Sequence, residues 1–186
     1  MNNKLEKACE AEQALASAIV VHSEEVIEQA LNDMAAKINE DYKNRCPLIL
    51  CVMNGGLIAT ARLVSKLTMP LEIDYIHATR YNNGTTGAAL SWLAEPKISL
   101  EGRDIIIVDD ILDEGVTLQA LIKFCNEKGA NSTVTAILAR KVHDRCVDNQ
   151  LGDYVGVDVP DKYVFGCGMD YKGFFRNLPA IFAIKE

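Results

Sequence analysis

Three carboxylates and a glycine turn directly follow an apolar segment in the middle of the chain. Residues 105–108 are all isoleucine or valine, which is typical of a strand buried in a parallel sheet. Asp109, Asp110 and Asp113 come next, followed by the turn 115–117, where a helix begins. Ligands in open α/β sheets bind at the carboxyl ends of strands, and the first turn of a helix offers unpaired N–H groups to an anion. The segment therefore predicts an anion site beside acids, which suits sugar hydroxyls, a metal ion or both.

The acids also have an alternative interpretation, because strand ends are often solvated and helices are often capped by Asp. Asp109 and Asp110 are adjacent and have no basic neighbour, so they repel each other unless solvent, a cation or ligand hydroxyls stabilise them. Asp113 could cap the helix or accept a proton, and local sequence does not separate these roles. We favour the functional interpretation because three acids and a glycine turn fall on one site.

A second strand leads into a glycine turn. Residues 48–53 predict a strand, Asn54-Gly55-Gly56 a turn, and the apolar spacing over residues 57–67 a helix. Glycines after a strand let the backbone approach a ligand closely. A Gly-Gly pair is more often only a turn, so its position gives it weight. Two neighbouring strand ends of this kind could bind two separate phosphates.

The rest of the chain alternates between helical and strand periods, which predicts an α/β fold with a mostly parallel sheet. Further helices are predicted over residues 23–39 and 116–128, and further strands over residues 71–76 and 134–138. Short apolar runs at residues 154–157, 163–166 and 180–184 predict edge strands or a small cap on the sheet. Residues 78–103 follow neither period, and a segment of this length favours a mobile lid.

Composition limits the classes of protein. A chain of 186 residues suits one domain, and its formal net charge of −7 argues against a nucleic-acid-binding surface. No apolar run reaches membrane-spanning length, and the first residues lack the pattern of a secretory signal. Six cysteines without a C-x-x-C pair indicate reduced thiols in a cytoplasmic protein and make a zinc site improbable.

Basic, aromatic and histidine residues in isolation predict little. Basic residues after the strand 134–138, namely Arg140, Lys141 and Arg145, would ordinarily serve solubility. Tyr163 could belong to the core, as aromatic residues usually do. Three histidines are too scattered for a metal site and have no acid partner evident from the sequence, so we assign no chemistry to His22, His77 or His143.

The order of these motifs resembles a known family. Two acids, two apolar residues, Asp, a variable residue, Gly, a variable residue and Thr, at residues 109–117, resemble the phosphoribosyl-diphosphate signature of the type I phosphoribosyltransferases. Residues 160–178 are similar to the purine-binding hood of the hypoxanthine or hypoxanthine-guanine phosphoribosyltransferases. The resemblance implies a single domain, residues 1–186, with a twisted, mostly parallel sheet flanked by helices. Its core would span about residues 20–140, and a small hood over the active site would combine about residues 141–186 with the N-terminal segment.

The resemblance also implies an activity. Members of this group transfer the 5-phosphoribosyl unit from phosphoribosyl diphosphate to N9 of a 6-oxopurine, hypoxanthine or guanine, and release diphosphate with the help of Mg²⁺. The partners would then be these small-molecule substrates, with no nucleic acid and no membrane. A cytoplasmic homodimer or homotetramer is expected.

Residues that match the family's motifs receive roles through the resemblance. Asp113 would be the catalytic residue that accepts the proton leaving N7 of the purine. Ribose and the 5-phosphate would be bound by Asp109, Asp110, Asp113, Glu114, Gly115, Val116 and Thr117. Diphosphate would be bound by Met53, Asn54, Gly55 and Arg176, and the Met53-Asn54 peptide bond would be cis. The purine would be bound by Lys141, Tyr163, Val164 and Asp170. Metal ligands would be Asp109, Asp110 and Asp170, and the lid would carry Arg80 and Tyr81.

Three residues depart from the family pattern, and one alternative function stays open. Asn54 stands where Lys or Arg is common, Glu114 where Ser or Thr is usual, and Arg80 where a small hydroxyl residue is usual. The alternative is a non-catalytic regulator with the same fold that binds nucleotides. The retained Lys141 and the acidic charge favour the enzyme. A receiver-type phosphoacceptor domain would need its acid pair after the first strand, so the order of elements argues against it.

Overall fold

The main sheet is mostly parallel. The computed structural model describes residues 3–80, 90–148 and 150–185, and within them one sheet has the strand order β4-β3-β2-β5-β6-β7. Its strands are β2 (Leu48–Val52), β3 (Glu72–Arg80), β4 (Leu90–Ala94), β5 (Asp104–Leu112), β6 (Ser132–Lys141) and β7 (Tyr154–Val159). β4 pairs antiparallel with β3, and the other neighbours pair in parallel. The predicted α/β fold is confirmed.

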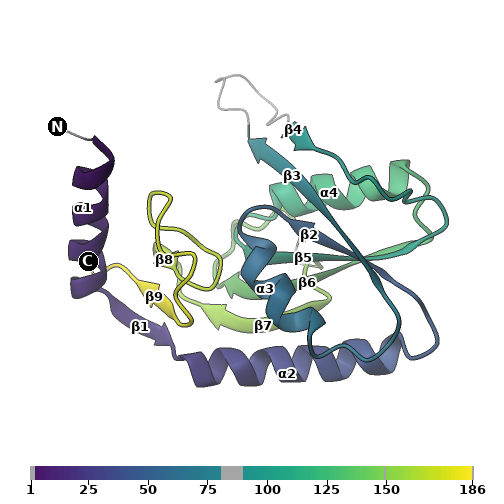
Figure 1. The fold of residues 1–186 in the computed structure, drawn as a ribbon, viewed down its shortest axis with the longest axis horizontal. Coiled ribbons are helices and arrows are strands. Elements are labelled where there is room, and N and C mark those ends of the chain that lie inside the picture. Colours follow the sequence, from purple (N-terminus) through teal and green to yellow (C-terminus); the bar gives the residue numbers. More distant parts are fainter. Residues whose placement is uncertain (1–2, 81–89, 149, 186) are drawn as a thin grey trace.

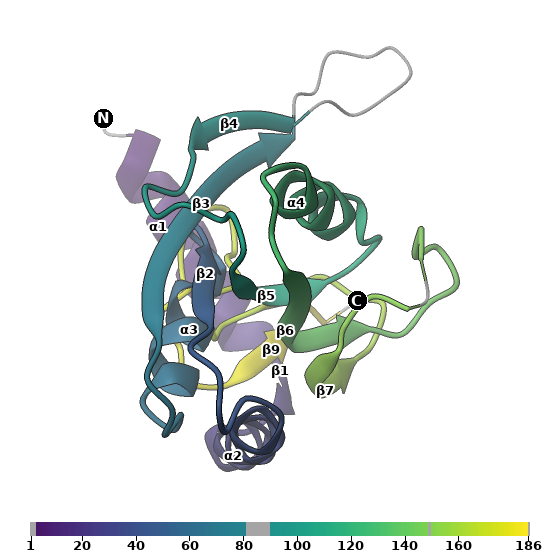
Figure 2. The ribbon, with the colours of Figure 1, turned by 90° about the vertical axis from the view of Figure 1, so that its right-hand side faces the viewer.

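Helices cover both faces of this sheet (Figures 1 and 2). Helices α2 (Glu24–Asp41) and α3 (Gly56–Val64) lie on one face, and α4 (Val116–Glu127) lies on the other. Successive side chains of a strand point to opposite faces, so Ile106 packs with α2 and α3 whereas Ile107 packs with α4. Because both faces are covered, β5 has the continuous apolar run seen in the sequence.

A small antiparallel sheet lies at the end of the molecule to which the arrows of β6 and β7 point (Figure 1). It has the order β1-β9-β8, formed by β1 (Ile19–His22), β8 (Val164–Phe165) and β9 (Ile181–Ala183), and helix α1 (Asn3–Ser17) lies beside it. We call this sheet and residues 160–180 the hood. Its position at the carboxyl ends of the parallel strands places it over the predicted site.

The hood and the main sheet share one apolar cluster. Hood side chains such as Met169 and Ile181 are buried with Met34 of α2 and Leu138 of β6. This continuity supports the proposal of a single domain. β7 lies in the main sheet although its residues fall within the range that we assigned to the hood.

The structured elements are longer than the apolar patterns. β5 continues through both adjacent acids to Leu112, and β6 continues to Lys141, because the backbone pairing of the two strands extends beyond their apolar runs. Within the segment 78–103, β4 forms an antiparallel ladder with β3. Residues 81–89, which belong to the predicted lid, lie outside the described residues. No helix in the described ranges has the length and apolarity needed to cross a bilayer.

Two isoleucines on either side of β2 test the placement of the core. Ile106 in β5 and Ile73 in β3 both pair with Ile49, but Ile106 is fully buried and Ile73 is 52% exposed. Ile106→Ala should lower the free energy of unfolding by about 2–5 kcal/mol because it leaves a cavity. The control Ile73→Ala should cost about 1 kcal/mol or less. Urea denaturation measures both, and equal losses would contradict this core assignment.

Candidate active site

Two adjacent carboxylates lie near the end of β5 in the middle of the sheet. Asp110 is 8% exposed, and its backbone N–H donates to Asp109 Oδ1 over 2.9 Å. Burial, together with the neighbouring Asp110 carboxylate, raises the pKa of Asp109 well above its ordinary value, and burial raises the pKa of Asp110. A cation or a set of hydroxyl donors would stabilise the ionised pair.

Glycines enclose Asp110 on two sides. A Cβ on Gly55 would overlap the Asp110 carboxylate, and a Cβ on Gly168 would overlap the carbonyl oxygen of Gly55. Gly168 also has a φ of +108°, in the region that favours glycine. The Met53-Asn54 peptide bond is cis, as predicted. The predicted diphosphate loop, the β5 acids and the hood therefore meet at one point.

The turn after β5 forms one side of a cleft. Gly115 has a φ of +80° and is the N-cap of α4, so Asp113 is not the helix cap. The cleft has a volume of about 210 Å³ and is lined by Asp109, Asp110, Ile111, Leu112, Asp113, Gly115, Thr117 and Leu118. The N–H groups of the first helical turn have no partner within the helix and suit an anion. This cleft contains most of the residues predicted to bind ribose and the 5-phosphate.

Glu114, which departs from the family pattern, lies beside the segment 143–147. Its side chain is half-buried, and its carbonyl oxygen accepts a hydrogen bond from the Val147 N–H over 2.9 Å. Hydrogen bonding to Asp161 raises the pKa of Arg145, and the charges of Asp113 and Glu114 act in the same direction. The negative charge of Glu114 therefore interacts with Arg145.

A second cleft, also of about 210 Å³, brings the predicted purine residues together. It is lined by Asp110, Ile111, Asp113, Lys141, Tyr163, Val164, Met169 and Asp170. Tyr163 is 51% exposed, so its ring is not a core residue. Its hydroxyl donates to the carbonyl oxygen of Asp170 over 3.0 Å, which fixes the ring at the rim of this cleft.

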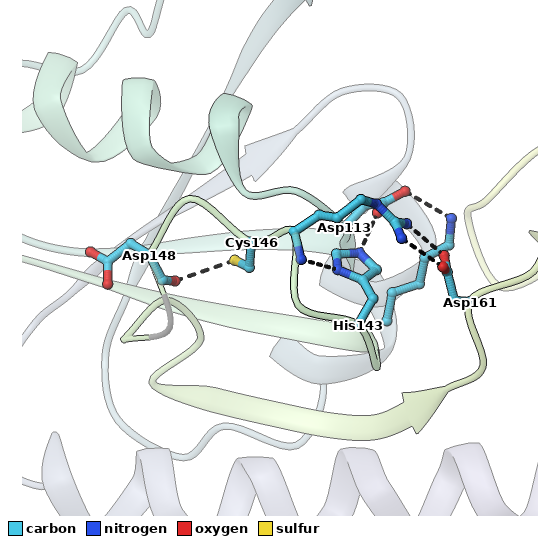
Figure 3. Close-up of polar contacts among 7 residues, drawn as sticks. Asp113, His143, Cys146, Asp148 and Asp161 are labelled. Atoms are coloured by element: carbon cyan, nitrogen blue, oxygen red, sulfur yellow. Dashed lines mark hydrogen bonds and ion pairs between the residues drawn. The ribbon is translucent and has the colours of Figure 1, made fainter.

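Asp113 lies between two donors (Figure 3). Lys141 Nζ donates to Asp113 Oδ2 over 2.8 Å, and His143 Nε2 lies 2.7 Å from Asp113 Oδ1. Burial alone would raise the pKa of Asp113, but the hydrogen bonds from Lys141 and His143 outweigh it, and the pKa lies below its ordinary value. Asp113 is thus ionised at neutral pH, as a proton acceptor must be.

The sequence prediction missed His143. We assigned it no chemistry because no acid partner was evident, but the structure gives it one, Asp113, which lies 30 residues earlier in the chain. The parallel ladder of β5 and β6 pairs Leu112 with Arg140, so the residues that follow the two strands become neighbours. Strand adjacency was the available signal, because it places residue 113 beside residues 141–143.

Arg176 joins the hood to the acids of β5. Arg176 donates to the carbonyl oxygen of Gly168 over 2.6 Å, forms an ion pair with Asp170, and lies 3.8 Å from Asp110 Oδ2. In the described part of the chain no three acidic, His or Cys side chains are grouped so as to hold a metal. The predicted ligands Asp109, Asp110 and Asp170 therefore do not form an all-protein metal cage.

Of the two predicted lid residues, Arg80 and Tyr81, only Arg80 belongs to the described residues. β3 ends at Arg80, and Tyr81 falls outside the described residues. Asn54, the departure in the predicted diphosphate loop, is exposed immediately before α3. The site that the structure describes consequently comprises the two clefts, the loop 53–56 and Arg176.

Comparisons with known proteins agree with this arrangement. A model of the phosphoribosyl transferase domain matches residues 20–172. The hypoxanthine-guanine phosphoribosyltransferase of Streptococcus agalactiae is 35% identical over 168 residues, which cover 90% of this chain and 93% of the relative. The hypoxanthine-guanine phosphoribosyltransferase of Bacillus subtilis is 34% identical over 167 residues, which cover 89% of this chain and 92% of the relative. A crystal structure of a Staphylococcus aureus hypoxanthine phosphoribosyltransferase superposes with a TM-score of 0.84 at 27% identity, covering 90% of this chain and 91% of that one.

The chain belongs to the phosphoribosyltransferase family. Within that family its relatives are hypoxanthine and hypoxanthine-guanine phosphoribosyltransferases, so the resemblance drawn from its motifs is confirmed.

The raised pKa of Asp109 predicts an effect on stability. A pKa that is higher in the folded than in the unfolded chain favours folding below the unfolded-state pKa, and this contribution is lost as the pH rises through the folded-state pKa. Ionised Asp109 therefore opposes folding at neutral pH. Asp109→Asn should raise the melting temperature at pH 7.5 by about 2–4 °C. The difference should shrink as the pH falls, and a lower melting temperature for the variant at pH 7.5 would contradict the prediction.

Proposed function

We propose that this protein transfers the 5-phosphoribosyl group from phosphoribosyl diphosphate to N9 of hypoxanthine or guanine, forming IMP or GMP in purine salvage. One observation carries the proposal: Lys141, Tyr163 and Asp170 line the same cleft as Asp113 and Asp110. The residues to which we assign purine binding, proton acceptance and ribose binding are therefore adjacent. Membership of the phosphoribosyltransferase family supports the same reaction.

Lys141 would select the base. Its ammonium group carries only hydrogen-bond donors, so it suits the 6-oxo oxygen of hypoxanthine or guanine. An adenine amino group at that position would place a donor against a cation and leave both without an acceptor. The exposed ring of Tyr163 would stack on the base, and the backbone of Val164 would form hydrogen bonds with it.

Asp113 would act in the bond-forming step. N9 of the purine attacks C1 of the ribose, the bond from C1 to diphosphate breaks, and the N7 proton passes to Asp113. Lys141 now donates to Asp113 Oδ2, so in the complex it would turn to the 6-oxo oxygen and free Oδ2 to accept that proton. The ribose becomes oxocarbenium-like, and Asp109 and Asp110 would hold its hydroxyl groups.

The carboxylates at the site fit Mg²⁺. Mg²⁺ takes oxygen ligands and is usually bound by protein carboxylates together with substrate phosphates. We propose Asp109, Asp110 and Asp170 as the residues that would hold it. When bound, the ion would neutralise charge on the departing diphosphate.

Arg176 would contact diphosphate and supply the positive charge that Asn54 does not. Arg80 and Tyr81 would close over the reacting centre and exclude water that would otherwise capture the ribose. A cytoplasmic homodimer or homotetramer is part of the same proposal.

A substrate panel tests this function. Purified protein with Mg²⁺ and phosphoribosyl diphosphate should convert hypoxanthine or guanine to the nucleotide and leave adenine unchanged, because adenine offers Lys141 a donor. Product is measured by chromatography, and the reaction without Mg²⁺ is the control. If no 6-oxopurine gives product, the enzymatic proposal fails. Nucleotide binding without turnover would favour the non-catalytic regulator instead.

Asp113→Asn tests the proton acceptor. The amide keeps the size of the carboxylate but does not accept the N7 proton, so turnover should fall by about 10²-fold or more. IMP binding, followed by calorimetry, should largely survive. Asp158→Asn is a suitable control, because it disrupts the Arg140 ion pair, in which both side chains are about half exposed, and should leave turnover nearly unchanged. Loss of IMP binding in parallel with turnover would indicate a structural role for Asp113.

A further inference from the structure

His143 is buried against the proposed proton acceptor. It lies two residues beyond β6, and its side chain is only 4% exposed. Its Nε2 lies 2.7 Å from Asp113 Oδ1 (Figure 3). A buried imidazole in direct contact with a carboxylate usually fixes the orientation of that carboxylate.

The second ring nitrogen of His143 determines where the ring carries its hydrogen. The backbone N–H of Arg145 donates to His143 Nδ1 over 3.1 Å (Figure 3). A nitrogen that accepts a hydrogen bond cannot carry a hydrogen itself, so the neutral ring has its hydrogen on Nε2. His143 Nε2 is therefore the donor, and Asp113 Oδ1 is the acceptor.

The two oxygens of Asp113 consequently have different surroundings. Oδ1 accepts from His143, whose side chain is only 4% exposed, whereas Oδ2 accepts from Lys141, which lines the cleft with Tyr163 and Asp170. Only Oδ2 becomes available when Lys141 turns to the purine. We infer that His143 is a positioning residue: by donating from Nε2 to Oδ1 it holds the Asp113 carboxylate with Oδ2 directed at the purine N7. The inference rests on the proposed role of Asp113 as proton acceptor.

The segment around His143 is itself held on both sides. Arg145 forms two hydrogen bonds of 2.8 Å with Asp161, in the hood turn that precedes Tyr163. On the other side, the Val147 N–H donates to the carbonyl oxygen of Glu114, and a Cβ on Gly115 would lie 3.2 Å from Cys146 Sγ. Contacts from the hood and from the turn before α4 thus restrict the backbone that carries the ring, as positioning of a reacting group requires.

The two ring nitrogens allow a purely structural role to be separated from positioning. A structural role would depend on the hydrogen bond from the Arg145 N–H to Nδ1, because that bond shapes the loop. Positioning would depend on the bond from Nε2 to Asp113. In His143→Asn the side-chain oxygen can replace Nδ1 as acceptor, but nothing replaces Nε2. In His143→Gln the longer amide can place a donor near the position of Nε2.

Steady-state kinetics with hypoxanthine and phosphoribosyl diphosphate compare wild type, His143→Asn and His143→Gln. For His143→Asn, kcat should fall by about 10–100-fold, while KM for both substrates and the melting temperature change little. His143→Gln should recover most of kcat. Both variants with wild-type kcat, or both with the same loss, would overturn the inference.

A double-mutant cycle keeps the test decisive if one variant is unstable. Since His143 acts through Asp113, adding His143→Asn to Asp113→Asn should lower kcat little further. Additive losses would indicate an independent structural role and overturn the inference. Wild-type turnover in the same assay separates the two proposals. An inactive wild type refutes the proposed function and this inference with it. An active wild type whose variants show additive losses refutes the inference alone.

Discussion

Parallel pairing of β5 with its two neighbours is the constraint on which the site depends. The register aligns Leu112 with Arg140, so the chain leaves both strands at the same level and Asp113 meets Lys141 and His143. A slip of one residue would turn every side chain of β5 to the opposite face of the sheet. The buried isoleucines that hold this register therefore also hold the acids in place.

The same arrangement concentrates unfavourable charge. Asp109 and Asp110 are adjacent carboxylates with raised pKa values, and glycine backbone fills the space around Asp110 where side chains could have carried hydrogen-bond donors. Stability supplied by the apolar core must offset this cost, as is common where a site is arranged for ligand binding. Arg176, the cation near Asp110, comes from the hood, so the hood contributes electrostatically as well as sterically.

The hood depends on the core for its position. Its apolar side chains are buried with α2 and β6, while its turn at Asp161 is joined to Arg145 in the loop after β6. The cleft lined by Lys141 and Tyr163 therefore has one wall from the hood and one from the sheet. The segment 143–147 connects the hood to the turn before α4, and its His143 contacts Asp113, whose side chain is only partly buried.

Local patterns were sufficient for some features of this protein. The β-branched run before Asp109 predicted a strand buried on both faces, because that property depends on neighbouring residues. The acid-glycine motif and residues 160–178 resembled a family, and that resemblance implied the cis bond at Met53-Asn54. The tertiary structure alone decided which residue lies against the far side of Asp113. The contact of His143 with Asp113 arises from the pairing of β5 with β6, and pairing between distant segments leaves no periodic signal in either segment.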